Sequence, residues 1–328
     1  MPPATIGSPT LWIGFLLFVL CMLALDLGVF HRRAHAVTLS EAGAWSAVWV
    51  MLALIFNLGV WHWHGTERAL EFGAGYLIEK ALSVDNIFVF VIIFGYFRIP
   101  AAHQHRVLFW GILGALGSRA AFILMGGAFL RSFHWAIYVF GGVLALTGIR
   151  LMLERKREPH PERNPVVRLL RRLIPTTDAL HGSAFLAKVA GRRFATPLLL
   201  ALLTVEVTDV VFAIDSIPAV FAVTSDSFIV FTSNIFAILG LRSLYFLLAG
   251  VVDRFAHLKL GLALILVFVG AKMLVSELYQ VPIGVSLAVI AVLLGGSIVT
   301  SLLASSAAAA RLQSVSAKAP CDPQRHMG

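Results

Sequence analysis

Long apolar stretches separated by short polar segments dominate the chain. A run of about 20 apolar residues is long enough to cross a bilayer as a helix. We therefore predict an all-α, polytopic membrane bundle of about nine transmembrane helices. The predicted spans are residues 9–30, 43–63, 69–97, 107–130, 133–153, 197–223, 228–252, 258–276 and 281–304.

The composition narrows the class of protein further. The 328 residues are 59% hydrophobic and 13% charged, whereas soluble domains are about 25% charged. The first span carries Asp26 and has no basic residue before it, so we expect a retained helix rather than a cleaved signal peptide. The two cysteines, Cys21 and Cys321, form no CxxC motif, which argues against dithiol chemistry and thiolate metal sites.

Basic residues gather on one side of the predicted membrane. Residues 150–193 alone hold eleven Lys and Arg. Because such residues accumulate on the cytoplasmic side, we predict an outside N-terminus, a cytoplasmic C-terminus and a cytoplasmic loop at 154–196. This topology accounts for the net charge of +9 without a nucleic-acid partner. The loop is expected to be a linker, partly helical at 163–173, with binding of anionic lipid headgroups as the alternative.

Two of the spans contain a matched acidic motif. Segments Glu79–Ile87 and Asp209–Ile217 both read acid, five residues, Asp, a small polar residue and Ile. An ionised acid near the middle of a membrane helix costs about 2.5–3.5 kcal/mol on insertion scales. A matched pair of such motifs is therefore a candidate functional site.

The spans that follow each acidic motif also resemble each other. The fourth and seventh spans each contain one arginine, Arg119 and Arg242, and the fifth and eighth match at Gly148 and Gly270. We predict one three-helix unit used twice, at residues 69–153 and 197–276. The two units would cross the membrane in opposite senses, as the inverted repeats of secondary transporters do. Residues 1–304 would then form one transmembrane domain, and 305–328 a flexible cytoplasmic tail.

Such a repeat would bring Asp85 and Asp215 together near the membrane midplane. Pro218 follows Asp215 closely, and a proline ring collides with the carbonyl four residues before it. We therefore expect a kink or an unwound segment beside Asp215, which would let carboxylates and freed carbonyls point at one place. Such breaks are tolerated only where they are buried in protein or line a cavity.

Helical geometry groups the remaining polar residues. At 100° per residue, Glu79 shares a helix face with Asn86, and Asp209 shares one with Ser216. The candidate ligands all offer oxygen, which suits hard divalent cations such as Mn²⁺, Mg²⁺ and Ca²⁺. They are Glu79, Asp85, Asn86, Glu206, Asp209, Asp215 and Ser216.

Other interpretations of these residues stay open. The acids could form ion pairs that only stabilise the bundle, with Lys80, Arg119, Arg242 and Lys272 as partners. The same bases could serve an exporter of anions or tellurium compounds. A third possibility is a membrane scaffold that hands metal to other proteins. The sequence has no phosphate loop, HExxH helix or cofactor fingerprint, so we predict neither an enzyme nor a bound cofactor.

Three segments, Asp26–Arg32, Glu79–Phe90 and Val205–Ala219, closely resemble the TerC family, in particular its Alx-like branch. The resemblance covers roughly residues 10–300. That family has a multi-helical membrane fold, is similar to the LysE transporter superfamily, and is linked to manganese export and, by its name, to tellurium resistance. The resemblance implies a Mn²⁺ exporter of a bacterial inner membrane whose acids bind the transported ion. Proton exchange and homo-oligomer formation remain open.

Overall fold

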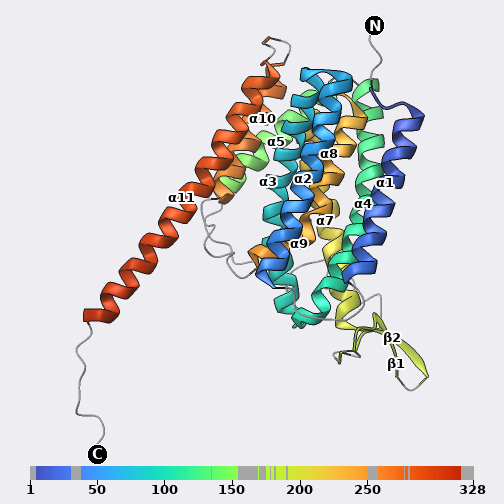
Figure 1. Cartoon of the computed structure of the whole chain (residues 1–328), viewed down its shortest axis with the longest axis vertical. Coiled ribbons are helices and arrows are strands. Elements are labelled where there is room, and N and C mark those ends of the chain that lie inside the picture. Colours follow the sequence, from blue (N-terminus) through green and yellow to red (C-terminus); the bar gives the residue numbers. More distant parts are fainter. Residues whose placement is uncertain are drawn as a thin grey trace, which may run out of the picture.

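The computed structural model confirms an all-α bundle (Figure 1). The structure describes residues 5–30, 38–133, 135–153, 169, 175–177, 179–180, 182–189, 191–249, 258–276, 278–279 and 281–318. Its helices are α1 (Pro9–Phe30), α2 (Leu39–His64), α3 (Thr66–Tyr96), α4 (Ala101–Ser132), α5 (Ala136–Leu153), α7 (Pro197–Phe221), α8 (Ser227–Leu239), α9 (Leu241–Leu248), α10 (Leu258–Leu274) and α11 (Ile283–Lys318). Strands β1 (Leu186–Val189) and β2 (Arg192–Ala195) form an antiparallel hairpin.

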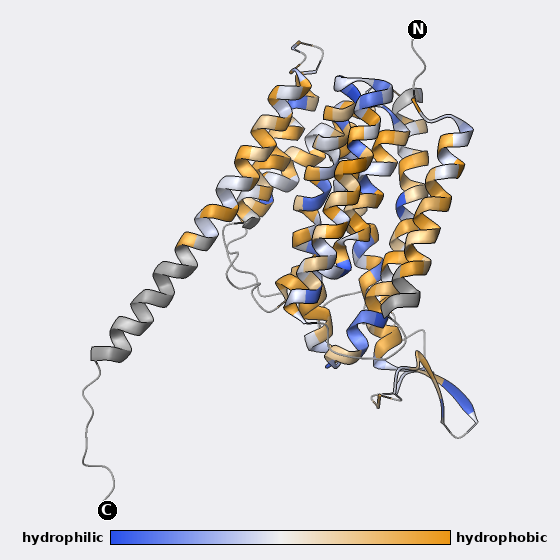
Figure 2. Ribbon diagram, in the orientation of Figure 1, coloured by the Kyte–Doolittle hydropathy of each residue, from blue (hydrophilic) through white to orange (hydrophobic). Residues whose placement is uncertain are grey.

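Six helical segments among the described residues are long and apolar enough to cross a membrane. They lie in α2, α4, α5, α7, the α8–α9 pair and α11. Although α3 has 31 residues, it is not one of the six, because every 18-residue stretch of it contains at least three charged residues. Hydrophobic residues predominate along the helices of the bundle (Figure 2). The membrane class is thus confirmed, while the count of nine spans and the inverted repeat stay predictions.

Several boundaries differ from those predicted. The seventh span is divided at Gly240 into α8 and α9, and α11 continues to Lys318, past the predicted end of the last span at residue 304. The β1–β2 hairpin lies in the loop predicted as a linker, where its alternating apolar residues are too few to signal strands. The helical piece expected at 163–173 lies, apart from Leu169, outside the described residues.

Helices α5 and α10 pack with their backbones in contact. A Cβ added at Gly148 would lie 2.7 Å from the carbonyl oxygen of Ala263, and one added at Gly270 would lie 2.7 Å from the carbonyl oxygen of Gly141. Small residues permit this close approach between membrane helices. The predicted repeat makes Gly148 equivalent to Gly270 and, at the same spacing, Gly141 equivalent to Ala263. The contact between Gly148 and Ala263 is therefore equivalent to the contact between Gly270 and Gly141.

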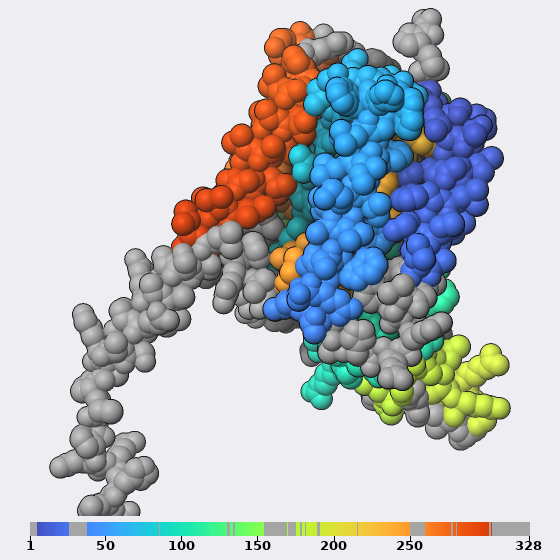
Figure 3. All heavy atoms as spheres, viewed as in Figure 1, coloured from blue at the N-terminus to red at the C-terminus, as the bar shows by residue number. Residues whose placement is uncertain are grey.

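The centre of the bundle is formed by four helices, α3, α4, α7 and α8. Helix α3 packs against α8 and α7, and α4 packs against α7 and α8. The predicted repeat makes α3 equivalent to α7 and α4 equivalent to α8. The packing of α3 against α8 is therefore equivalent to the packing of α7 against α4. Helices α1 and α2 pack with α8 in one apolar cluster, and together with α11 they form much of the face turned to the viewer in Figure 3. The four central helices are therefore shielded on this side by apolar helices.

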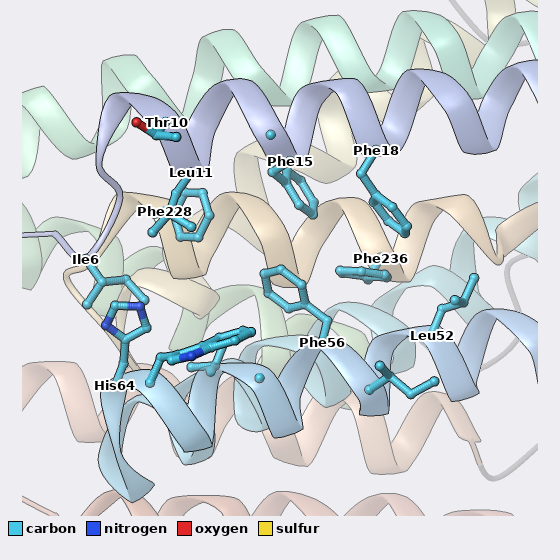
Figure 4. A pocket seen from close by; sticks show the side chains of 15 residues that line it. Ile6, Thr10, Leu11, Phe15, Phe18, Leu52, Phe56, His64, Phe228 and Phe236 are labelled. Carbon is cyan, nitrogen blue, oxygen red and sulfur yellow. The ribbon is translucent and has the colours of Figure 1, made fainter.

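An apolar groove of about 410 Å³ opens between α1, α2 and α8 (Figure 4). Aromatic rings form most of its floor, with the centroids of Phe15 and Phe56 5.5 Å apart and those of Phe56 and Phe236 5.0 Å apart. The described residues that line it include Thr10 and His64 but no carboxylate. The groove is therefore separate from the acidic motifs.

The end of the bundle near the N-terminus is held by two buried acids. Asp226 caps α8 and accepts hydrogen bonds from the hydroxyl of Thr5 and the backbone N–H of Ile6, each at 2.7 Å. Glu71 accepts hydrogen bonds from Arg68 and from the hydroxyl of Thr224, each at 2.8 Å. These contacts tie the α7–α8 loop to α3 and to the chain before α1.

Candidate functional site

Helix α3 carries Glu79 and Asn86 on one buried face. Glu79 is fully buried and Asn86 is 2% exposed. Both side chains line a cavity of about 190 Å³ whose wall is otherwise mostly apolar, with Leu82 and Phe212 among its residues. The spacing of seven residues therefore has the predicted effect of directing both side chains to one place.

Helix α7 brings Asp209 and Ser216 to the same region. Asp209 is 3% exposed and Ser216 is 2% exposed. Ser216 lines the cavity, and its hydroxyl has no hydrogen-bond partner. Burial of a hydroxyl without a partner costs about 1–3 kcal/mol. Protein stability alone therefore does not explain why a serine is present at this position.

The unwound segment expected beside Asp215 is not found. Helix α7 is continuous from Pro197 to Phe221 and includes Pro218. A proline removes one backbone hydrogen bond, here the one to the carbonyl of Ile214. Pro218 lies in the last turn of the helix, so the remaining hydrogen bonds hold the segment in helical form.

Arg119 of α4 connects the two acidic motifs and is itself fully buried. Its Nε donates to Oδ2 of Asp209 at 3.2 Å, and its Nη2 donates to Oδ1 of the same residue at 2.9 Å. Its Nη1 donates to Oε1 of Glu79 and, at 2.8 Å, to Oδ1 of Asn234. Asn234 in turn donates from Nδ2 to Oε2 of Glu79 at 3.1 Å.

We call Glu79, Arg119, Asp209 and Asn234 the polar network. Each of its members comes from a different helix: α3, α4, α7 and α8. The network contains two carboxylates and one guanidinium, so in their ionised forms one negative charge is unbalanced. Buried charges are tolerated when they are paired and hydrogen-bonded. The network therefore holds the four helices together around a charged centre.

The structure does not bring every predicted ligand into this region. Glu206 is half-buried, and its carboxylate lies against α4 where a Cβ added at Gly114 would collide with it. It does not line the cavity. The side chains of Asp85 and Asp215 lie outside the described residues, although their backbones belong to α3 and α7. Their predicted approach to each other stays a prediction.

The predicted alternative of a stabilising ion-pair network fits Arg119, which binds two of the candidate acids. Lys80 behaves differently, because its ammonium group donates to the carbonyl oxygen of Ala237 at 3.4 Å and lies 6.0 Å from the ring of Tyr76. Arg242 is 8% exposed on α9. Arg119, which belongs to the first predicted repeat, thus links the two acidic motifs by contacting Glu79 and Asp209.

Asn234 and Thr147 belong to the region but were not predicted. Asn234 completes the hydrogen bonding of Glu79, and Thr147 of α5 lines the cavity. A signal for Asn234 exists in the sequence, since Thr232, Ser233 and Asn234 are three consecutive polar residues inside an apolar span. Thr147 has no such signal, because a single threonine is common in membrane helices.

The described side chains do not by themselves form a metal site. Within that part of the chain, no group of three or more His, Cys, Asp or Glu is placed to hold a metal ion. Glu79 and Asp209 come close enough to share Arg119, and Asn86 and Ser216 line the cavity beside it. A cation bound here would need further oxygens from neighbouring groups.

Comparison with known proteins gives long matches. The family described as "Integral membrane protein TerC family" matches residues 64–309. A Myxococcus xanthus protein, "Uncharacterized membrane protein STKORF319", is 60% identical over 301 residues, which are 92% of this chain and 94% of that protein. The Escherichia coli K12 protein named "Putative membrane-bound redox modulator Alx" is 50% identical over 296 residues, covering 87% and 92%. No solved structure matches the chain.

Proposed function

Because the chain belongs to the TerC family of integral membrane proteins, we propose that it is a transporter that exports Mn²⁺ across a bacterial inner membrane. The proposal places the ion at the cavity beside the polar network. It further assigns Glu79, Asp85, Asn86, Glu206, Asp209, Asp215 and Ser216 as ligands along its path. The proposal does not fix whether protons are exchanged for the ion; flux measured with and without a pH gradient decides this.

One observation carries this proposal. Carboxylates from two acidic motifs, far apart in the sequence, meet at a buried guanidinium next to a cavity that contains an unpaired hydroxyl. Charged groups inside a membrane protein are costly and mark ion pathways. Oxygen ligands favour hard divalent cations. The resemblance to the TerC family favours Mn²⁺ among those cations.

The polar network disfavours an exporter of anions or tellurium compounds. An oxyanion would need a cationic group free to bind it. Arg119 already donates to two carboxylates and to Asn234, so its hydrogen-bonding capacity is directed at acids. The anion alternative thus has less support from the geometry than cation transport.

The printed name of the Escherichia coli relative suggests redox modulation as another role. A dithiol couple would need both cysteines of this chain. Cys21 is a free, exposed cysteine of α1, and Cys321 lies outside the described residues. We propose that any redox effect follows from metal transport rather than from thiol exchange in this protein.

The proposed orientation has an outside N-terminus and a cytoplasmic C-terminus. Arg106, near the start of α4, donates to the hydroxyl of Ser183 at 2.8 Å, which ties the loop before the β1–β2 hairpin to that end of the bundle. The basic residues of this loop favour the cytoplasmic side. A reporter fused after residue 180 is expected in the cytoplasm, and an outside location would overturn the orientation.

Ion flux into everted membrane vesicles tests the function. Vesicles with the wild-type protein are expected to accumulate Mn²⁺ in preference to Mg²⁺, Ca²⁺ and tellurite, measured with and without a pH gradient. Asp85→Asn and Asp215→Asn should each abolish this flux while leaving the protein inserted and abundant. Movement of tellurite without Mn²⁺ would support the anion alternative. An absence of all flux, with altered metal content of cells, would support the scaffold alternative.

A further inference from the structure

Every carboxylate oxygen of the polar network is already engaged by a donor. Both oxygens of Asp209 and Oε1 of Glu79 accept from Arg119, and Oε2 of Glu79 accepts from Asn234. A divalent cation bound by carboxylates uses the same oxygens. The guanidinium and the transported ion therefore have the same partners.

We propose that Arg119 is a tethered cation that competes with the transported ion for Glu79 and Asp209. The inference rests on the proposed function and adds a specific role for one side chain. In the ion-free protein the guanidinium pairs with both carboxylates and offsets one of their two negative charges. When the ion binds, the guanidinium gives up its hydrogen bonds to the carboxylates. When the ion leaves, those hydrogen bonds form again and oppose rebinding.

The cavity provides a place from which an ion can displace Arg119. Its wall includes Arg119, Glu79, Asn86 and Ser216, and its volume is about 190 Å³. A water molecule occupies about 30 Å³ in the liquid, so the cavity has room for an ion with several waters. The buried hydroxyl of Ser216 has no partner in the structure and offers a further oxygen at the cavity wall.

Asn234 gives the displaced guanidinium a partner that is not a carboxylate. Its Oδ1 accepts from Nη1 of Arg119 at 2.8 Å. A neutral amide can keep this hydrogen bond while Glu79 and Asp209 turn to the ion. Without Arg119 the empty site would hold two buried carboxylates with no cation, which is strongly unfavourable. The tethered cation thus lowers the affinity for the ion and favours its release.

The experiment measures Mn²⁺ binding to purified protein in detergent by the paramagnetic resonance signal of free Mn²⁺. Compared with wild type, Arg119→Gln is expected to bind Mn²⁺ about tenfold more tightly, which corresponds to ~1.4 kcal/mol. Added Mn²⁺ should also raise its unfolding temperature by more than it raises that of wild type, because ligand binding stabilises the folded form. Flux into proteoliposomes should fall, since release is slower.

Two further variants keep the result interpretable. Arg106→Gln removes a basic residue that donates to the hydroxyl of Ser183 and does not line the cavity, so it should leave Mn²⁺ affinity unchanged. Arg119→Lys keeps a positive charge but lacks the two-pronged guanidinium, and its affinity should lie between those of wild type and Arg119→Gln. It also provides the comparison if Arg119→Gln does not fold.

Two outcomes separate this inference from the proposed function. If wild type binds Mn²⁺ and the folded Arg119 variants bind it equally or more weakly, Arg119 is not a competitor and the inference is overturned while the function stands. If wild type neither binds nor moves any divalent cation, the proposed function is overturned, and the inference with it.

Discussion

Two interfaces of the bundle join the predicted repeats by opposite physical means. Helices α5 and α10 meet through glycines with backbone against backbone, which gains dispersion energy from close approach. Helices α3, α4, α7 and α8 meet around Arg119 and two buried carboxylates. Apolar residues of similar volume often replace a buried ion pair without loss of stability. The first interface is thus explained by stability, whereas the second calls for another reason, which we propose is ion transport.

The largest loss of stability is expected from a substitution that breaks the polar interface. Asp209→Asn removes the carboxylate that accepts from both Nε and Nη2 of Arg119. Loss of one partner of a buried ion pair destabilises strongly, here by about 3 kcal/mol. Thermal unfolding in detergent should show a lower transition temperature for this variant. Glu67→Gln, at an exposed position at the start of α3, is the control and should leave the transition unchanged.

An unchanged transition for Asp209→Asn would contradict the pairing between α4 and α7. In that case the comparison between the two interfaces would fail, because the polar interface would contribute nothing to stability. Loss of Mn²⁺ flux at unchanged stability would still agree with the proposed function.

A smaller effect is expected at the apolar interface. The methyl group of Gly148→Ala would meet the carbonyl oxygen of Ala263 and, at 2.9 Å, the backbone nitrogen of Val267. Overpacking of this kind costs about 1–3 kcal/mol. Gly142→Ala is a matched control on the same helix, since its methyl group would have no neighbour within 4 Å.

The readout for Gly148→Ala has two parts. Its unfolding temperature should be lower than that of Gly142→Ala, while Mn²⁺ flux per folded molecule should be the same for both variants. If flux per folded molecule were lost without a change in stability, the α5–α10 interface would belong to the transport machinery and not to the scaffold.

The smallest effect on stability is expected at the cavity. Ser216→Ala removes a buried hydroxyl that has no partner, so stability should be unchanged or should rise by up to about 1 kcal/mol. Mn²⁺ affinity should nevertheless fall, because an oxygen ligand is lost. Thermal unfolding and Mn²⁺ titration of the same sample check both statements. A clear loss of stability would mean that the hydroxyl has a structural partner.

Hydrophobic patterning predicted the all-α membrane class, because apolar runs of span length are a strong signal in a bilayer. The seven-residue spacing also placed Glu79 and Asn86 on one cavity. The division at Gly240 was not predicted, because hydropathy continues across it from α8 to α9. Of the two forms expected beside Asp215, the unwound segment was wrong, since the sequence alone does not show that one lost hydrogen bond near a helix end leaves the helix continuous, while the kink stays a prediction.

The polar network could be predicted only in part. Arg119 was identified as a buried base and as one partner for the acids, but its simultaneous contact with Glu79 and Asp209 depends on how three helices meet. Asn234 was missed because it belongs to neither acidic motif and contacts Glu79 across 155 positions of sequence. Such contacts are set by helix packing, which one-dimensional periodicity does not encode.

The most direct test of the central claim uses a charge-balanced variant. Glu79→Gln combined with Arg119→Gln removes one negative and one positive group, so the buried network keeps its net charge while it loses a ligand. Mn²⁺ flux into proteoliposomes is measured for wild type and this double variant at equal amounts of folded protein. We predict that the double variant folds and that its flux is lost. Retained flux would contradict the assignment of the buried carboxylates as the ion site.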